Sequence, residues 1–258
     1  MLNASRSIQY QKYEKSEAPS SESGDIIVEE HLTLMVNGEE WLTFMCTPLD
    51  LEALGIGFLY NENIIESMNE ISNYTLCKNS AIDIWLTHEA KKPQEWLRTS
   101  GCTGGKTHHH RALVRARIEN TKTLPPDDIF NSVELLLASQ SLYRTARGVH
   151  CSILCDGKKV LHVSEDIGRH NTFDKLAGLS LMKPAENNPR MIVTTGRVSS
   201  EMMQKAARLG ATTVISLTSP TTTSVTLAGE LGVTLIGYAR KSSFNVYTNN
   251  HLIIHPHP

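Results

Sequence analysis

The regular alternation of strand and helix patterns near the C-terminus constrains the fold more than any other feature of the sequence. The expected strands lie at 190–194, 212–217 and 233–238, and the expected helices at 200–209 and 222–231. Gly210 and Gly232 follow the two helices, in the position where a glycine commonly ends a helix. This alternation predicts parallel strands joined by right-handed helical crossovers.

The segments before this alternation also carry local signals. Hairpins are predicted around Asn37-Gly38 and Asp156-Gly157, because both dipeptides favour the tight turns that join antiparallel strands. A helix is expected to begin with Thr47 as its N-cap and Pro48 as its first residue. Residues 124–128, which contain two prolines, are typical of a joint between domains.

The chain is therefore expected to have three parts. Residues 1–24 are rich in Ser, Glu and Lys, which predicts a disordered tail. Residues 25–124 are expected to form a smaller α+β N-terminal domain with a mobile loop around Cys102. Residues 125–258 are expected to form an α/β domain in which helices cover both faces of a mixed sheet.

The composition excludes several classes of protein. The 258 residues are 40% hydrophobic, which is enough for a sizeable core, and the net charge of −2 does not suggest a nucleic-acid binder. No run of 18 apolar residues is present, so no membrane insertion is expected. The first residues also lack the apolar run of an export signal, and we therefore expect a cytoplasmic protein whose five cysteines are reduced.

Polar and basic residues gather where the three alternating strands end. The first strand ends in residues 194–197, which include Arg197, and the second ends in residues 218–222, which include Ser219 and Thr221. The third strand ends in Tyr238, Ala239, Arg240, Lys241, Ser242 and Ser243. The carboxyl ends of parallel strands share one edge of a sheet, and ligands commonly bind there. The first two ends lead into helix N-termini, which attract anions. Together with the three bases, this edge predicts a site for phosphate or pyrophosphate.

Structural interpretations of the same residues remain open. Ser199 and Thr221 also stand where helix N-caps belong. In the cluster 165–171, Arg169 and His170 are candidates for positioning a ligand, and Glu165, Asp166 or His170 could be a general acid or base. Alternatively, Asp166 could cap the next helix, and Arg169 and Asp174 could form internal ion pairs.

Cys102 lies in the unusual stretch RTSGCTGGKTHHH at 98–110. Glycines on both sides leave the thiol accessible, and the surrounding bases would lower its pKa. A thiolate is both a nucleophile and a sulfur acceptor; the alternative is a loop cysteine without a role. The spacing to the three histidines matches no usual zinc pattern, so no metal site is expected. The other four cysteines, at 46, 77, 151 and 155, are expected to be core or edge residues.

Several longer segments carry a family resemblance. They are EDIGRHN at 165–171, TGR at 195–197, YAR at 238–240 and FNVYT at 244–248, within a likeness that spans roughly residues 26–248. In these segments the sequence resembles the formate dehydrogenase accessory proteins of the FdhD/NarQ family.

The resemblance implies a sulfurtransferase. Members of the family take sulfur from a cysteine desulfurase as a persulfide and pass it to Mo-bis(molybdopterin guanine dinucleotide), the cofactor that formate dehydrogenase needs. The resemblance further implies a homodimer, and a C-terminal three-layer domain like that of cytidine deaminases. It assigns the persulfide to Cys102 and cofactor binding to residues 238–243.

The sequence departs from the family at one point. Many relatives carry C-x-x-C in this loop, whereas Cys102 here is followed by Thr103, Gly104 and Gly105. This departure counts against a mechanism that needs two loop thiols, whereas a single persulfide carrier needs only one. A zinc-dependent deaminase is disfavoured, because the H-x-E and P-C-x-x-C signature is absent. A non-catalytic chaperone that holds the cofactor or the apo-enzyme remains as the alternative function.

Overall fold

The computed structural model describes residues 4–77, 80–93, 96–98, 106–108, 117–119, 121, 123–185 and 190–254, of which 96–98 and 106–108 are described as backbone alone. Cys102, the candidate sulfur-carrying residue, and its loop lie outside the described residues. None of the helices in the described part of the chain is both long and apolar enough to cross a membrane.

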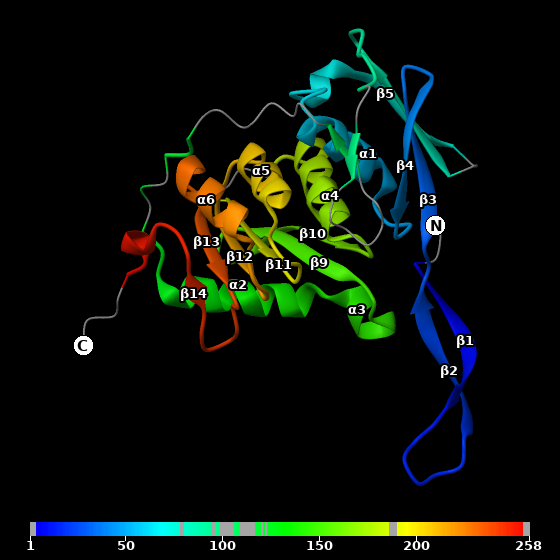
Figure 1. Cartoon of the computed structure of the whole chain (residues 1–258). Helices are drawn as coiled ribbons and strands as arrows, with labels where there is room; N and C mark the ends of the chain where they lie inside the picture. Colours follow the sequence, from blue (N-terminus) through cyan, green and yellow to red (C-terminus); the bar gives the residue numbers. More distant parts are fainter. Residues whose placement is uncertain are drawn as a thin grey trace.

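The N-terminal segment forms a hairpin where a disordered tail was predicted. β1 (Ser5–Lys12) and β2 (Ser20–Ile27) pair antiparallel along their whole length. The Tyr10 hydroxyl donates across the pair to the Glu22 carboxylate at 3.3 Å. The prediction of a tail is therefore wrong from residue 5 onward, because composition does not register cross-strand pairs. The hairpin projects away from the rest of the molecule (Figure 1).

The next part is a four-stranded sheet with the order β4-β3-β6-β5. β3 runs parallel to β6, and the other neighbours are antiparallel. Asn37 and Gly38 join β3 to β4 with φ angles of 52° and 80°, which confirms the predicted turn. The main elements are β3 (Glu30–Val36), β4 (Glu39–Cys46), α1 (Leu51–Asn61), β5 (Ile71–Cys77) and β6 (Ala81–Leu86). Shorter ones are η1 (Met68–Glu70), β7 (Trp96–Arg98) and β8 (Lys106–His108).

The start of α1 differs from the prediction. The helix begins at Leu51 rather than at Pro48, and Thr47 is not its N-cap. Thr47 is fully buried and contacts the other half of the chain: its N–H donates to Asp166 Oδ2 and its hydroxyl accepts from the N–H of Ile167, both at 3.1 Å. A tertiary contact thus uses the hydroxyl that a local rule assigns to the cap.

The C-terminal part is built on a six-stranded mixed sheet with the order β10-β9-β11-β12-β13-β14. β11, β12 and β13 are parallel, as the alternation predicted, and the other neighbours are antiparallel. The strands are β9 (His150–Cys155), β10 (Val160–Asp166), β11 (Arg190–Thr194), β12 (Ala211–Ser216), β13 (Thr234–Gly237) and β14 (Asn245–Val246). The helices are α2 (Pro126–Ser139), α3 (Ser141–Ala146), α4 (Arg169–Met182), α5 (Ser200–Arg208), α6 (Thr222–Leu231) and η2 (Asn250–Leu252).

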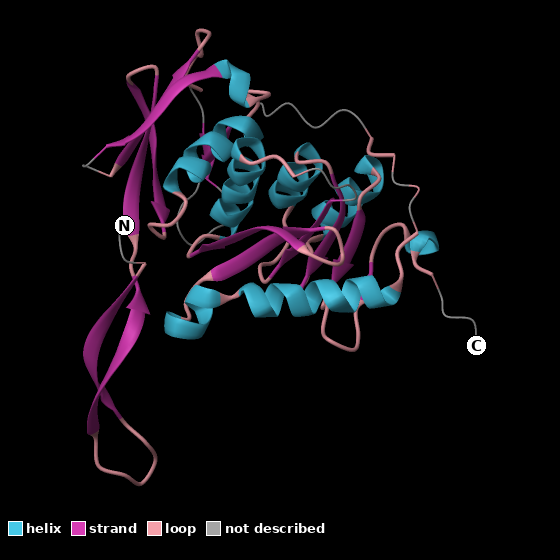
Figure 2. Cartoon of the chain, turned by 180° about the vertical axis from the view of Figure 1, so that it is seen from behind, coloured by secondary structure: helices cyan, strands magenta, loops and turns pink. Residues whose placement is uncertain are grey.

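Helices cover both faces of this sheet, as predicted. α2 lies along one face, and α4, α5 and α6 lie along the other (Figures 1 and 2). Val133 of α2 packs with Ile153 of β9 in one core, and Phe173 of α4 packs with Met202 of α5 in the other. The three-layer mixed α/β arrangement is therefore confirmed. Its likeness to cytidine deaminases and the domain boundary at residue 124 stay predictions.

The two halves meet where α1 crosses α4. A Cβ atom added at Gly57 or at Gly178 would overlap the backbone of the opposite helix. Only glycine therefore allows the helices to approach this closely. Beside the crossing, Lys205 Nζ lies 2.6 Å from Asp174 Oδ2, and both side chains are almost fully buried. This contact fixes α4, whose N-terminus lies at the candidate site.

Candidate functional site

The ends of four strands form one edge of the large sheet. β10 is antiparallel to β9 and β9 is antiparallel to β11, so β10 runs in the same direction as β11, β12 and β13. Backbone bonds join the loops that follow: the Leu217 N–H donates to Thr194 O at 3.0 Å, and the Tyr238 N–H donates to Thr218 O at 2.9 Å. The three predicted strand ends therefore lie side by side.

The helix N-caps at this edge are structural. Ser199 accepts a hydrogen bond from the N–H of Met202, and Thr221 forms a reciprocal capping box with Ser224. Both hydroxyls therefore satisfy helix ends, which confirms the structural interpretation. Ser219 is half-buried in the loop that leads into α6.

The β12–β13 end of the edge presents basic side chains to solvent. Arg240, Lys241 and the two serines that follow are exposed, whereas Ala239 is fully buried. The Arg240 guanidinium donates to the carbonyls of Leu217 at 2.5 Å and Ala239 at 2.8 Å, which holds it over the end of β12. Tyr238, with a φ of 52°, is 47% exposed beside it. Arginine in this setting can bind a phosphate group.

A cavity of about 340 Å³ opens between α2 and these strand ends. Val133, Leu137 and Leu217 provide apolar walls, and Arg240 and Lys241 line the same cavity. Such a cavity can hold a flat ring with an attached anion, since apolar walls with a few polar groups are typical of ligand sites.

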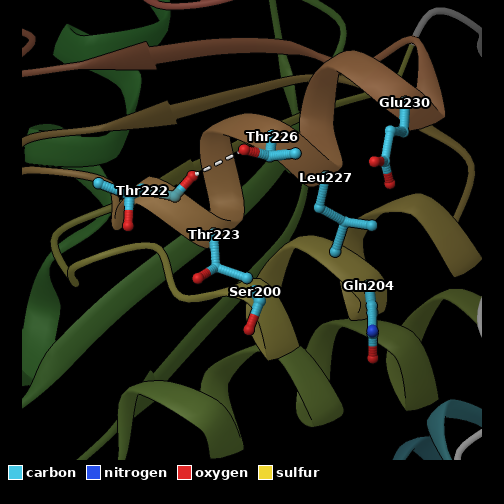
Figure 3. Close-up of a pocket in the computed structure, with 7 residues that line it drawn as sticks. All are labelled: Ser200, Gln204, Thr222, Thr223, Thr226, Leu227 and Glu230. Carbon is cyan, nitrogen blue, oxygen red and sulfur yellow. Dashed lines mark hydrogen bonds between the residues drawn. The ribbon is translucent and has the colours of Figure 1, made fainter.

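A second cavity, of about 450 Å³, lies between α5 and α6 (Figure 3). Its lining is rich in hydroxyls, from Ser200, Thr222, Thr223 and Thr226, and Glu230 is the charged residue that lines it. A phosphate would meet a negative charge here, so this cavity suits an anion less well than the first.

The acidic residues at the β10 end have structural partners within the protein. Glu165 accepts hydrogen bonds from the N–H groups of Leu142 and Tyr143 and from Ser141, and so it caps α3. Asp166 is fully buried and lies 2.6 Å from Lys175 Nζ. Neither carboxylate is available as a general acid or base.

Arg169 and His170 begin α4 but face different neighbours. Arg169 packs against Gly196, where a Cβ atom would lie 3.0 Å from the Arg169 Cβ, and the exposed Arg197 follows. His170 Nε2 is 3.5 Å from Ser199 Oγ and from a carboxylate oxygen of Glu201. Arg169 therefore belongs to the edge, whereas His170 belongs to the contact between α4 and α5.

His150 is a candidate that sequence reasoning missed. Its Nδ1 lies 3.4 Å from Thr195 Oγ1 at the same edge. Burial lowers the pKa of His150, and the nearby Arg169 lowers it further. The crevice rule considers carboxyl ends of strands, but β9 is antiparallel and brings its first residue to this edge. A histidine at the first position of a strand that is antiparallel to its neighbours would have been the signal.

The buried thiols contrast with the accessible thiol expected of a carrier. Cys46, Cys151 and Cys155 are fully buried, as predicted. Burial raises the pKa of Cys46 and of Cys151 to about 12, so both remain thiols near neutral pH. Cys77 is half-buried at the end of the edge strand β5. Within the described ranges, no three His, Cys, Asp or Glu side chains are placed to hold a metal ion.

Comparisons with known proteins agree on one family. Residues 27–254 match the model of the FdhD/NarQ family. A protein of Bacillus licheniformis named sulfur carrier protein FdhD is 35% identical over 249 residues, which is 94% of each chain. The Bacillus subtilis protein of the same name is 34% identical over 92% of this chain and 93% of its own. A crystal structure described as a formate dehydrogenase accessory protein from Desulfotalea psychrophila superposes with a TM-score of 0.79 at 25% identity, over 98% of this chain and 100% of the other.

Proposed function

Since this chain belongs to the FdhD/NarQ family, we propose that it is a sulfur carrier in the maturation of a formate dehydrogenase. The observation that carries the proposal is the match over residues 27–254, together with relatives that are themselves named sulfur carriers. The donor in the proposal is a cysteine desulfurase, and the acceptor is Mo-bis(molybdopterin guanine dinucleotide). The cytoplasmic location and the homodimer stay predictions.

The proposed carrier is the Cys102 thiolate. It attacks the outer sulfur of the persulfide on the desulfurase, so that a new S–S bond forms at Cys102 and the cysteine of the desulfurase leaves as a thiolate. The buried thiols of Cys46, Cys151 and Cys155 are unsuited to this step, because a persulfide partner cannot reach them. Cys77 is partly accessible and is therefore the proper control.

The proposed binding site for the cargo is the carboxyl edge of the large sheet. Arg240 and Lys241 would contact the phosphates of one guanine nucleotide, and the apolar cavity beside them would take the base. Tyr238, Ala239, Ser242 and Ser243 complete this wall, with Arg197, Arg169 and Ser219 along the same edge. Thr221 and His170 are used in a cap and in a helix contact, so we leave them out of the proposed set.

The decisive experiment is mass spectrometry of the full chain after incubation with a desulfurase and cysteine. We expect one additional sulfur atom on the Cys102 peptide, and loss of formate dehydrogenase maturation in Cys102→Ala. The matched control Cys77→Ala should load sulfur and support maturation normally. Normal maturation by Cys102→Ala would overturn the carrier and favour the chaperone, which binds the cofactor without moving sulfur.

A further inference from the structure

The N-terminal hairpin has no part in the proposed function. β1 and β2 form a separate two-stranded sheet, and the hairpin projects away from the rest of the molecule in both views (Figures 1 and 2). Its two strands contact the short helix α3. A two-stranded hairpin by itself is only marginally stable in water. A projecting hairpin of this length is therefore expected to gain stability from a further contact.

The two faces of the hairpin differ in polarity. Because side chains alternate along a strand, the register of β1 and β2 places Ile8, Tyr10 and Ile26 on one face, which we call the apolar face. These three side chains are 36%, 42% and 46% exposed. Beyond the first pair of residues the other face is polar, and its members are Ser7, Gln9, Gln11, Ser21, Ser23 and Asp25. An antiparallel sheet with one apolar and one polar face commonly packs its apolar face against a core, which indicates that a partner covers this one.

The charges on the apolar face are arranged to suit a second copy of the same chain. Arg6 lies at the base of this face. The tip, residues 12–22, carries two lysines and three glutamates. Lys12 Nζ lies 3.0 Å from Glu14 Oε1 and 3.5 Å from Glu22 Oε1. One negative charge therefore remains at the tip, and one positive charge at the base. Two antiparallel copies would bring each base to the opposite tip, whereas parallel copies would place like charges together.

We propose that the apolar face of the hairpin binds the same face of a second copy of this chain, with the two hairpins antiparallel. Each strand has eight residues and spans about 26 Å at about 3.3 Å per residue, so the tip of one hairpin reaches the base of the other. Ile8 and Tyr10 lie at the middle of β1 and would pack against the same two side chains of the second copy. Every contact occurs twice, because a two-fold interface uses the same surface on both chains. This inference does not rest on sulfur transfer.

Sedimentation equilibrium of the full chain measures the dissociation constant of the dimer. We expect Ile8→Glu to raise this constant at least about 100-fold, because both copies lose a buried apolar side chain and gain a charge at the interface. The matched control is Gln9→Glu, which introduces the same charge at the next residue, on the polar face. It should change the constant by no more than about twofold, as expected of a surface substitution.

A charge exchange tests the antiparallel arrangement even if Ile8→Glu does not form the hairpin. Arg6→Glu and Glu22→Lys should each weaken their own dimer, since each variant places like charges at both base–tip contacts. An equimolar mixture should form heterodimers that bind about tenfold more tightly than either variant alone, because both contacts then join opposite charges. A variant that merely unfolds the hairpin would not be rescued by mixing.

Three results would overturn this inference. They are a monomeric wild type at every concentration measured, equal weakening by Ile8→Glu and Gln9→Glu, and a mixture that binds no more tightly than the separate variants. A monomeric wild type would leave the apolar face to a different protein. Persulfide loading of Cys102 requires no contact between copies, so a failure of the carrier proposal would be seen separately by mass spectrometry.

Discussion

The two ends of the carboxyl edge both carry charged residues but use them differently. At the β10 end, Asp166 and Lys175 are fully buried and paired. At the β13 end, Arg240 and Lys241 are exposed beside an apolar cavity. α1 packs over α4 at the first end, so that charge there must be neutralised within the protein. A charged strand end is thus an anchor or a binding site according to what packs over it.

The largest expected effect comes from removing one partner at the buried end. Lys175→Ala leaves the Asp166 carboxylate buried without its cation, which should lower the free energy of unfolding by about 3–5 kcal/mol. Urea denaturation followed by circular dichroism measures it. The matched control Lys241→Ala, at the exposed end, should change stability by no more than about 0.5 kcal/mol. An equal loss of unfolding free energy in the two variants would contradict the distinction between a buried, paired end and an exposed end.

A smaller effect is expected on binding at the exposed end. Arg240→Ala should weaken GDP binding by about 1.5–3 kcal/mol, the scale of a hydrogen bond between charged groups. Affinity for the wild type should also fall with added salt, because the partners are charged and exposed. Calorimetric titration of both proteins at two salt concentrations measures this. A salt-independent affinity, or the same affinity in both proteins, would place the nucleotide elsewhere.

The smallest expected effect is a pH slope from the buried end. Burial, and to a lesser extent Glu165, raises the pKa of Cys151 from 9.0 to about 12. The folded state therefore keeps this proton while the unfolded state loses it, so the stability contribution is complete below pH 9 and is lost as the pH rises towards 12. Between pH 9 and 10, the free energy of unfolding should fall by about 1 kcal/mol more in the wild type than in Cys151→Ala. Denaturation curves at the two pH values measure the difference. The same change with pH in the wild type and in Cys151→Ala would mean that folding does not shield the thiol from solvent.

Short-range patterns account for most of the predicted elements in the C-terminal half. The hydrophobic periodicity located β11, β12, β13, α5 and α6 to within one residue at most ends. The caps at Ser199 and Thr221 and the left-handed Gly232 were also predictable, because each depends on residues within one helical turn. The parallel order of the three strands followed from the helices between them.

The N-terminal hairpin shows where such patterns fail. The composition of residues 1–24 predicts a disordered tail, yet β1 and β2 within and just beyond it pair residue by residue. The prediction that Thr47 caps α1 is wrong for a related reason, since its hydroxyl contacts Ile167, which is 120 residues away in the chain. Local propensity cannot register either contact.

At the candidate site, too, some features follow from the sequence and others only from tertiary packing. The sequence by itself determined that Arg197, Arg240 and Lys241 follow parallel strands and therefore share one edge, because chain order and strand direction suffice for that statement. Only the tertiary structure decided that Glu165 caps a helix and that Asp166 forms a buried ion pair. It also decided that His170 contacts α5. It also decided that His150 reaches the edge from the opposite strand end. The physical reason is that burial and pairing depend on which segments pack together, and those segments are far apart in the chain.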